Sequence, residues 1–296
     1  MKNISVIGSG TMGNGIAHVF AQQNFSVNLI DINSQALEQA MITIAGNLDR
    51  QIKKEILSET QKQEVLMNIS THQSLETGIK NADLVIEAVT ESLQTKKDLF
   101  SEMDTLSPAE CLLVTNTSSI SITDLATATG RADKVIGMHF MNPVPVMQLV
   151  EVIRGYNTSD STVGRIIELA RTLGKVPVEV NDYPGFVSNR ILMPMINEAV
   201  YTLFQGIAGV KEIDQVMKLG MAHPMGPLQL ADFIGLDVCL AILRVLQEGF
   251  GDTKYAPCPL LVKMVEGRHL GKKTGSGFYN WRGDSRDLQV AEQFKR

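Results

Sequence analysis

The sequence has few cysteines, few aromatic residues and no long hydrophobic run. Its 296 residues contain three cysteines, Cys111, Cys239 and Cys258, which stand far apart and form no CxxC pair. Neither a disulfide framework nor a thiolate metal site is therefore indicated, and a reducing compartment, the cytoplasm, is expected. No apolar run reaches the roughly 18–20 residues that a membrane helix needs, so no membrane partner is expected. A strand is predicted almost directly after Met1, which leaves no room for a targeting peptide.

Charge of one sign is not concentrated anywhere in the chain. The net charge is −5, and 20% of the residues are charged against 44% hydrophobic ones. This balance is typical of a soluble globular protein, and it gives no reason to expect a nucleic-acid partner. No group of His, Cys or Asp residues has the spacing of metal ligands, so no metal is expected. The length is sufficient for two domains, each with its own core.

A glycine-rich loop follows the first predicted strand and precedes a helix. The loop consists of Gly8, Ser9, Gly10, Thr11, Met12 and Gly13. In a GxGxxG loop the first glycine allows a tight turn and the second lets a pyrophosphate approach the backbone. The third lets the helix pack closely on the strand, and the helix N-terminus faces the phosphates. The pattern predicts a dinucleotide site.

Asp31 supports this interpretation because it ends the next predicted strand, 27–30. An acid about 20 residues after such a loop binds the adenine-ribose hydroxyl. No arginine follows Asp31, since residues 32–34 are Ile, Asn and Ser. NAD is therefore favoured over NADP.

A helical pattern occupies residues 35–67 and breaks near Ser58. A crossover between neighbouring strands is usually shorter, so the segment is interpreted as an inserted helical hairpin. Several basic side chains lie on it, including Lys54. They form either a solvated charged face or a lid that binds the anionic tail of a ligand.

Polar residues follow the next two predicted strands, 83–87 and 112–115. Glu91 and Lys96 come after the first, and residues 116–119 form a small polar loop after the second. Ligands of open α/β sheets bind at the carboxyl ends of the strands. Ser118 in this loop either caps the following helix or hydrogen-bonds a substrate.

Two β-rich segments, 134–140 and 147–153, flank a proline-interrupted turn. If they pair as antiparallel neighbours across Pro145, His139 and Glu151 lie opposite each other, because both are equally far from it in the chain. A carboxylate that orients an imidazole makes a general base. The alternative is a hydrogen-bonded strand-end histidine beside a solvated glutamate.

The pattern changes after a last strand, 176–180, and a Pro-Gly pair at 184–185. Helices are expected at about 187–205, 210–219, 226–234, 236–248 and 258–267, with no clear strand. The predicted fold is α/β: a Rossmann-type, mostly parallel sheet domain (1–184, hairpin insertion about 35–68) followed by an all-α substrate and dimerisation domain (185–296). A homodimer is expected through apolar positions of these helices, namely Met193, Met195, Ile196, Leu203, Leu240, Ile242, Leu243, Val245 and Leu246.

Six segments together resemble the L-3-hydroxyacyl-CoA dehydrogenase family, and within it the stand-alone bacterial 3-hydroxybutyryl-CoA dehydrogenases. They are VIGSGTMGNGIA, NTSS, HFMNPVPVMQLVEV, PGFVSNR, HPMGPLQLADFIGLD and GKKTGSGFY. The resemblance covers nearly the whole chain, from Val6 to Tyr279. It implies NAD as cofactor, an acyl-CoA substrate and a role in fatty-acid and lipid metabolism.

The resemblance also implies roles for individual residues. It makes His139 the catalytic base and Glu151 its partner, with Ser118 and Asn189 holding the substrate's 3-oxygen or supporting the histidine. The implied cofactor contacts beyond the glycine loop and Asp31 are Glu91, Lys96, Ser118, Asn142 and Lys273. The implied CoA contacts are Asn47, Lys54 and Ser118.

The expected reaction is the reversible NAD-dependent oxidation of a short-chain (3S)-3-hydroxyacyl-CoA to the 3-oxoacyl-CoA. Two alternatives belong to other classes. One is a related dehydrogenase of a free hydroxy acid or sugar acid, which a CoA-dependence assay would distinguish. The other is a non-catalytic NAD-binding protein, which would be expected to have lost the histidine–glutamate pair that is present here.

Overall fold

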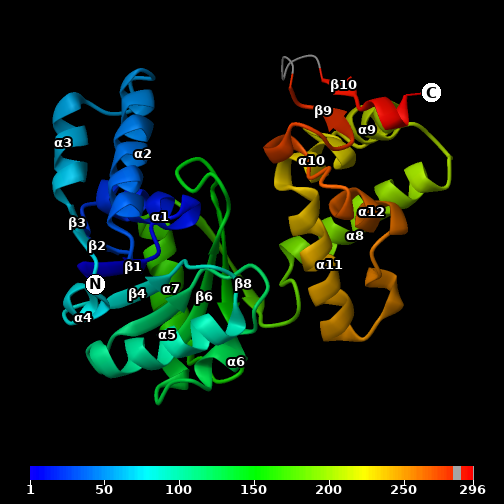
Figure 1. Ribbon diagram of the computed structural model, residues 1–296. Coiled ribbons are helices and arrows are strands. Elements are labelled where there is room, and N and C mark those ends of the chain that lie inside the picture. The colour runs from blue at the N-terminus through cyan, green and yellow to red at the C-terminus, as the bar shows by residue number, and fades with distance from the viewer. Residues whose placement is uncertain (283–287, 296) are drawn as a thin grey trace. The chain divides into compact units, whose positions relative to one another are not determined.

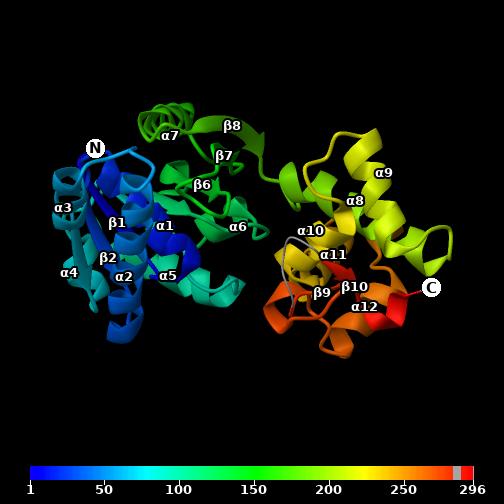
Figure 2. The same cartoon turned by 90° about the horizontal axis from the view of Figure 1, so that it is seen from above.

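The computed structural model describes residues 1–282 and 288–295. The chain divides into two compact units, Met1–Tyr183 (unit 1) and Pro184–Arg296 (unit 2), which Figures 1 and 2 show from two directions. Within the described residues no helix is both long and apolar enough to cross a membrane.

Unit 1 is built on an eight-stranded sheet with the strand order β3-β2-β1-β4-β5-β6-β7-β8. The strands are β1 (Asn3–Ile7), β2 (Ser26–Ile30), β3 (Ile69–His72), β4 (Leu84–Glu87), β5 (Leu112–Thr115), β6 (Val135–Phe140), β7 (Leu149–Arg154) and β8 (Val176–Asn181). All neighbours pair in parallel except β6 and β7, which are antiparallel. The predicted mostly parallel sheet is confirmed. Strand β3 was not foreseen.

Helices cover both faces of this sheet (Figure 1). They are α1 (Thr11–Gln22), α2 (Ser34–Ile52), α3 (Glu59–Met67), α4 (Leu75–Ile79), α5 (Leu93–Leu106), α6 (Ile122–Ala126) and α7 (Asp160–Thr172), with a 3-10 turn η1 (Ala132–Lys134). Leu84 and Ile86 join the core shared with α1, α2, α3 and α7, whereas Val85 between them is buried outside that cluster. Side chains of a strand alternate between faces, so strands covered on both sides are apolar throughout.

The hairpin predicted between the second strand and the rest of the sheet is formed by α2 and α3, which lie side by side in Figure 1. Asn33 caps α2 by accepting hydrogen bonds from the backbone N–H groups of Gln35 and Ala36. Ser58 caps α3 in a reciprocal capping box with Gln61. These caps satisfy N–H groups that a helix start leaves open, which explains the break near Ser58.

Unit 2 is helical, and in Figure 2 its helices α8, α10 and α11 lie together. Its elements are α8 (Ser188–Phe204), α9 (Val210–Gly220), α10 (Pro227–Ile234), α11 (Leu236–Phe250), η2 (Thr253–Tyr255), α12 (Pro259–Glu266), η3 (Lys272–Thr274), β9 (Tyr279–Asn280), β10 (Gln289–Val290) and η4 (Glu292–Phe294). The expected helical second domain is confirmed, and its described residues also contain the short strands β9 and β10, which pair in antiparallel fashion. Strands of two residues are too short to leave a periodic pattern in the sequence.

Most of the apolar positions that were expected to form a dimer surface are not exposed. Most of that set is buried inside unit 2, namely Met193, Ile196, Leu240, Ile242, Leu243 and Leu246. The apolar faces of amphipathic helices are used first to build the unit's own core, which explains the difference. The large apolar side chains that unit 2 does expose are others, among them Ile191, Phe204, Ile207, Val216, Leu219 and Met221.

Candidate active site

The glycine loop joins β1 to α1, and its three glycines serve different purposes. Gly8 has φ +95°, and a Cβ there would lie 2.6 Å from the carbonyl oxygen of Ala88. A Cβ on Gly13 would lie 1.7 Å from the carbonyl oxygen of Gly8, so neither position accepts a side chain. Gly10 faces open space, with no atom within 4 Å of its ideal Cβ. Gly10, the second glycine of the loop, therefore leaves room for a ligand rather than for a neighbouring chain segment.

The N-terminus of α1 is arranged to receive an anion. Gly10 occupies the cap position, and no side chain in the described part of the chain caps the helix there. The first backbone N–H groups of a helix have no partner within it, and the helix dipole favours negative charge. An uncapped helix start behind an open glycine fits the pyrophosphate of a dinucleotide.

Asp31 follows β2 and contacts the same loop. Its carboxylate accepts hydrogen bonds from the Ser9 backbone N–H at 2.9 Å and the Ser9 Oγ at 2.8 Å, and from the Asn33 N–H at 3.0 Å. Partial burial alone would raise the pKa of Asp31, but the hydrogen bonds from Asn33 and Ser9 outweigh it and lower the pKa. Asp31 is thus a fixed, ionised acceptor at the position expected for a ribose hydroxyl.

A buried ion-pair network lies at the carboxyl ends of β4 and β5. Lys96 is 1% exposed, and its ammonium lies 2.5 Å from Glu87 Oε1 and 3.3 Å from Glu91 Oε2. Glu87 is fully buried and also accepts hydrogen bonds from Thr115 Oγ1 and the Val89 N–H, each at 2.7 Å. Every partner of Glu87 is a donor, so the buried charge is compensated.

Glu91 organises the polar loop after β5. Its carboxylate accepts hydrogen bonds from the Ser118 N–H at 3.1 Å and the Ser119 Oγ at 3.1 Å, and also from the Thr117 hydroxyl. Burial would raise the pKa of Glu91, but the nearby Lys96 charge and these hydrogen bonds lower it. The suggestion that Ser118 caps the next helix is wrong, because Ser121 caps α6.

His139 and Glu151 pair as the sequence symmetry about Pro145 predicted. They are direct partners in the antiparallel register of β6 and β7. His139 Nδ1 lies 2.8 Å from Glu151 Oε2, and the two residues are only 9% and 2% exposed. Asn116 Oδ1 accepts a hydrogen bond from the Phe140 N–H at 2.9 Å, which ties the end of β6 to the polar loop. The alternative of a solvated edge glutamate is thereby excluded.

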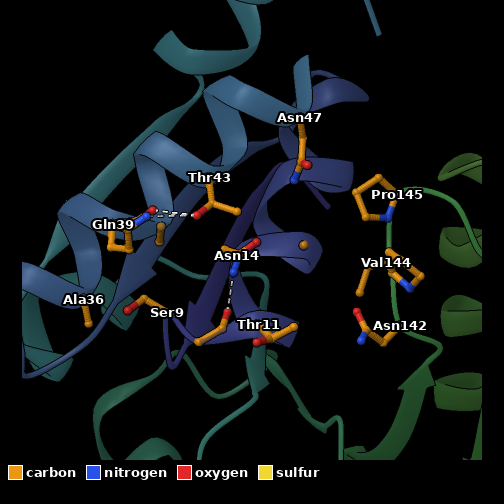
Figure 3. Close-up of a pocket in the computed structure, with 14 residues that line it drawn as sticks. Ser9, Thr11, Asn14, Ala36, Gln39, Thr43, Asn47, Asn142, Val144 and Pro145 are labelled. Carbon is orange, nitrogen blue, oxygen red and sulfur yellow. Dashed lines mark hydrogen bonds between the residues drawn. The ribbon is translucent and has the colours of Figure 1, made fainter. Parts of the chain in front are cut away.

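A pocket of about 400 Å³ opens between the glycine loop, α2 and the turn after β6 (Figure 3). Gln39, Thr43 and Asn47 project from one face of α2, and residues 142–145 form the opposite wall. None of the lining residues is charged. Asn47 accepts a hydrogen bond from Arg50, while Lys54 lies exposed in the turn between α2 and α3.

Two of the predicted site residues belong to unit 2. Asn189 is the second residue of α8 and is buried. Lys273 lies in η3, and its ammonium is 2.6 Å from Asp237 Oδ2.

Glu87 and Asn116 are structural members of the site that sequence reasoning did not single out. A charged residue at the end of an otherwise apolar strand, as in the segment DLVIE, is the signal that would have identified Glu87. Asn116 gave only the weaker signal of a polar strand end. In the described ranges no three His, Cys, Asp or Glu side chains gather in a way that could hold a metal.

Comparison with known proteins agrees with this geometry. Residues 3–183 match the sequence model of the 3-hydroxyacyl-CoA dehydrogenase NAD binding domain, and residues 185–281 match that of the 3-hydroxyacyl-CoA dehydrogenase C-terminal domain. A probable 3-hydroxybutyryl-CoA dehydrogenase of Bacillus subtilis is 52% identical over 95% of this chain and 98% of its own length.

Two further relatives extend the comparison. The 3-hydroxybutyryl-CoA dehydrogenase of Bradyrhizobium diazoefficiens is 51% identical, over 96% of each chain. The crystal structure of (S)-3-hydroxybutyryl-CoA dehydrogenase from Ralstonia eutropha superposes with a TM-score of 0.93 at 48% identity. That match covers 96% of this chain and 100% of the other.

Proposed function

Because this chain belongs to the 3-hydroxyacyl-CoA dehydrogenase family of NAD-dependent oxidoreductases, we propose that it interconverts (3S)-3-hydroxybutyryl-CoA and acetoacetyl-CoA with His139 as general base. The observation that carries the catalytic assignment is the buried 2.8 Å contact between His139 and Glu151. This pair lies on β6 and β7 of the sheet whose strand β1 leads into the uncapped glycine loop.

In the oxidation direction His139 takes the proton of the 3-hydroxyl group. Nδ1 is engaged by Glu151, so we assign the proton transfer to Nε2. The carboxylate holds the ring in one tautomer and stabilises the imidazolium that forms. A bound NAD would supply the hydride acceptor for C3. In the reduction direction His139 returns the proton to the 3-oxygen, and we propose that Ser118 and Asn189 hold that oxygen.

The proposed cofactor contacts combine the geometry of unit 1 with the residues that the family resemblance implies. We propose that the glycine loop from Gly8 to Gly13 binds the pyrophosphate and that Asp31 binds the adenine ribose. Asn142 lines the pocket, and we place it beside the nicotinamide. Glu91 and Lys273 complete the proposed set. Lys96, whose ammonium is buried against two carboxylates, would contribute by holding Glu91.

The pocket along α2 supports an acyl-CoA rather than a free acid. Gln39, Thr43 and Asn47 offer neutral amide and hydroxyl groups along one helix face. Such groups match the amide-containing pantetheine arm of CoA, while a carboxylate substrate would call for a cation. Lys54, exposed at the hairpin turn, is then available to the CoA phosphates.

The test is a rate comparison with NADH and NADPH across acetoacetyl-CoA, longer 3-oxoacyl-CoA esters and free acetoacetate. We expect reduction of acetoacetyl-CoA with NADH and little with acetoacetate. Equal rates on the free acid would favour a hydroxy-acid dehydrogenase instead, and no turnover of any substrate would favour a non-catalytic NAD-binding protein.

The catalytic assignment is tested by His139→Gln, with His223→Gln in unit 2 as a matched control. Loss of a general base typically lowers turnover by about 10²–10⁴-fold, while binding of NADH, measured by fluorescence titration, should be kept. Wild-type turnover in His139→Gln would refute the assignment of this residue as the base.

A further inference from the structure

A buried lysine holds the turn between β6 and β7. Lys175 immediately precedes β8 and is 8% exposed. Its ammonium donates hydrogen bonds to the carbonyl oxygens of Val144 at 2.6 Å and Met147 at 2.8 Å. No carboxylate within the described ranges forms an ion pair with it. The cation is therefore held by backbone carbonyls.

Burying an ammonium group without a carboxylate partner costs free energy. Burial disfavours a charged ammonium and lowers the pKa of Lys175. The neighbouring His18 on α1 is fully buried. Burial lowers the pKa of His18 to about 4, and the nearby charge of Lys175 adds to the lowering. His18 is thus neutral near pH 7 and adds no second positive charge, but it does not compensate Lys175 either.

The segment that Lys175 holds forms one wall of the pocket. Asn142 and Val144 line the pocket opposite the glycine loop (Figure 3). Val144 is also pressed against α1, since a Cβ on Gly15 would lie 2.9 Å from the Cβ of Val144. The separation between the glycine loop and Asn142 is therefore set by two contacts. One is the close packing of Val144 on Gly15, and the other is the pair of hydrogen bonds from Lys175 to the turn.

We propose that Lys175 is a positioning residue for the cofactor. By donating hydrogen bonds to the carbonyl oxygens of Val144 and Met147, it fixes Asn142 at the distance from the glycine loop that suits the nicotinamide half of NAD. Lys175 touches no ligand itself. The inference rests on the proposed function, because it assigns the pocket between loop and turn to the cofactor and the α2 face to the CoA arm.

The test compares Lys175→Met and Gly15→Ala with the wild-type chain. The first variant removes the cation with little change in side-chain length, and the second pushes Val144 away from α1. Since hydrogen bonds from a charged donor are worth more than neutral ones, we expect the Kd for NADH to rise by at least ~10-fold in Lys175→Met. Gly15→Ala should change the Kd in the same direction. The KM for acetoacetyl-CoA should stay near the wild-type value in both.

Lys134→Met is the matched control. Lys134 also donates to a backbone carbonyl, that of Ala109 at 2.8 Å, but it directly precedes β6, at the strand end opposite to the pocket. This variant should bind NADH like the wild type even if its Tm falls.

The proposal fails if Lys175→Met and Gly15→Ala both bind NADH normally while only Tm decreases, because Lys175 would then be merely structural. A rise confined to the KM for acetoacetyl-CoA would also overturn it. If Lys175→Met does not fold, Lys175→Gln, which removes the charge and shortens the side chain, is measured in its place, and wild-type binding of NADH by that variant would overturn the proposal. NADH binding and turnover by the wild-type chain test the proposed function separately.

Discussion

Replacing Glu151 with glutamine isolates the electrostatic part of the proposed catalysis. The amide has the same shape as the carboxylate, and its oxygen can still accept the hydrogen bond from His139 Nδ1, which lies 2.8 Å from Glu151 Oε2. The ring orientation should therefore survive, while the negative charge that stabilises the imidazolium is lost. Both residues are nearly buried, so water cannot replace that charge effectively.

The size of the effect follows from this geometry. Unit charges centred about 4 Å apart attract by ~4 kcal/mol at an effective dielectric constant of ~20. Desolvation reduces the net worth of a hydrogen bond to a charged group to about 1.5–3 kcal/mol. Since ~1.4 kcal/mol corresponds to a factor of ten in rate, kcat should fall by about 10- to 150-fold.

The assay is the steady-state reduction of acetoacetyl-CoA by NADH, with the Kd for NADH measured separately. Glu179→Gln is the matched control, because Glu179 lies on the adjacent β8 and forms a partly exposed ion pair with Arg154 at 2.8 Å. We expect kcat to be unchanged in the control and the Kd for NADH to be unchanged in both variants. A Glu151→Gln enzyme with wild-type kcat would refute the role of the carboxylate in catalysis.

Three further predictions concern the cofactor, the stability of unit 2 and assembly. Asp31→Asn removes the charge that repels a 2′-phosphate, so the ratio of kcat/KM for NADH over NADPH should fall by at least ~10-fold; an unchanged ratio would contradict the assignment of Asp31. Burial raises the pKa of Asp232 to about 6 from 3.8, despite hydrogen bonds from Trp281, Phe278 and Tyr279. Its folded-state pKa is the higher one, so its contribution to stability is present at acid pH and lost as the pH rises through 6. The destabilisation caused by Asp232→Asn in urea unfolding should therefore shrink from pH 4 to pH 7, and a pH-independent difference would contradict the shift. We also propose a homodimer through the exposed apolar residues of unit 2, so light scattering should give twice the chain's 32.4 kDa. Leu219→Asp, at a position 83% exposed, should weaken the dimer, and a monomeric wild type would disprove it.

The parts of the fold that the sequence predicted depend on local signals. The glycine loop, its flanking strand and Asp31 lie within one short stretch, where spacing alone indicates the chemistry. The structure adds the separate reasons for Gly8 and Gly13, whose Cβ atoms would meet backbone. The α2–α3 hairpin was predictable because its helical period and its cap at Ser58 are both local features.

The parts that were missed depend on contacts between distant segments. The sequence placed Lys96 near a ligand edge, but its burial against Glu87 follows from the pairing of β4 with its neighbours and from the path of α5. The sequence does not distinguish whether the apolar faces of α8 and α11 form a core or an exposed surface. Only the packing of the helices decides this. Lys175 has no motif around it, and its role emerges only when its carbonyl partners are known.

The pair of His139 and Glu151 was predictable because β6 and β7 form the antiparallel exception in the sheet. Parallel neighbours are joined by long crossovers, so their facing residues cannot be found by counting along the chain, whereas a hairpin makes register a matter of distance from its turn. The same turn carries Asn142 and accepts hydrogen bonds from Lys175. A shift of this turn would therefore disturb the dyad register and the pocket wall together. A directional cation–carbonyl contact restrains such a shift better than an apolar side chain could, which gives a physical reason for a buried lysine at this point.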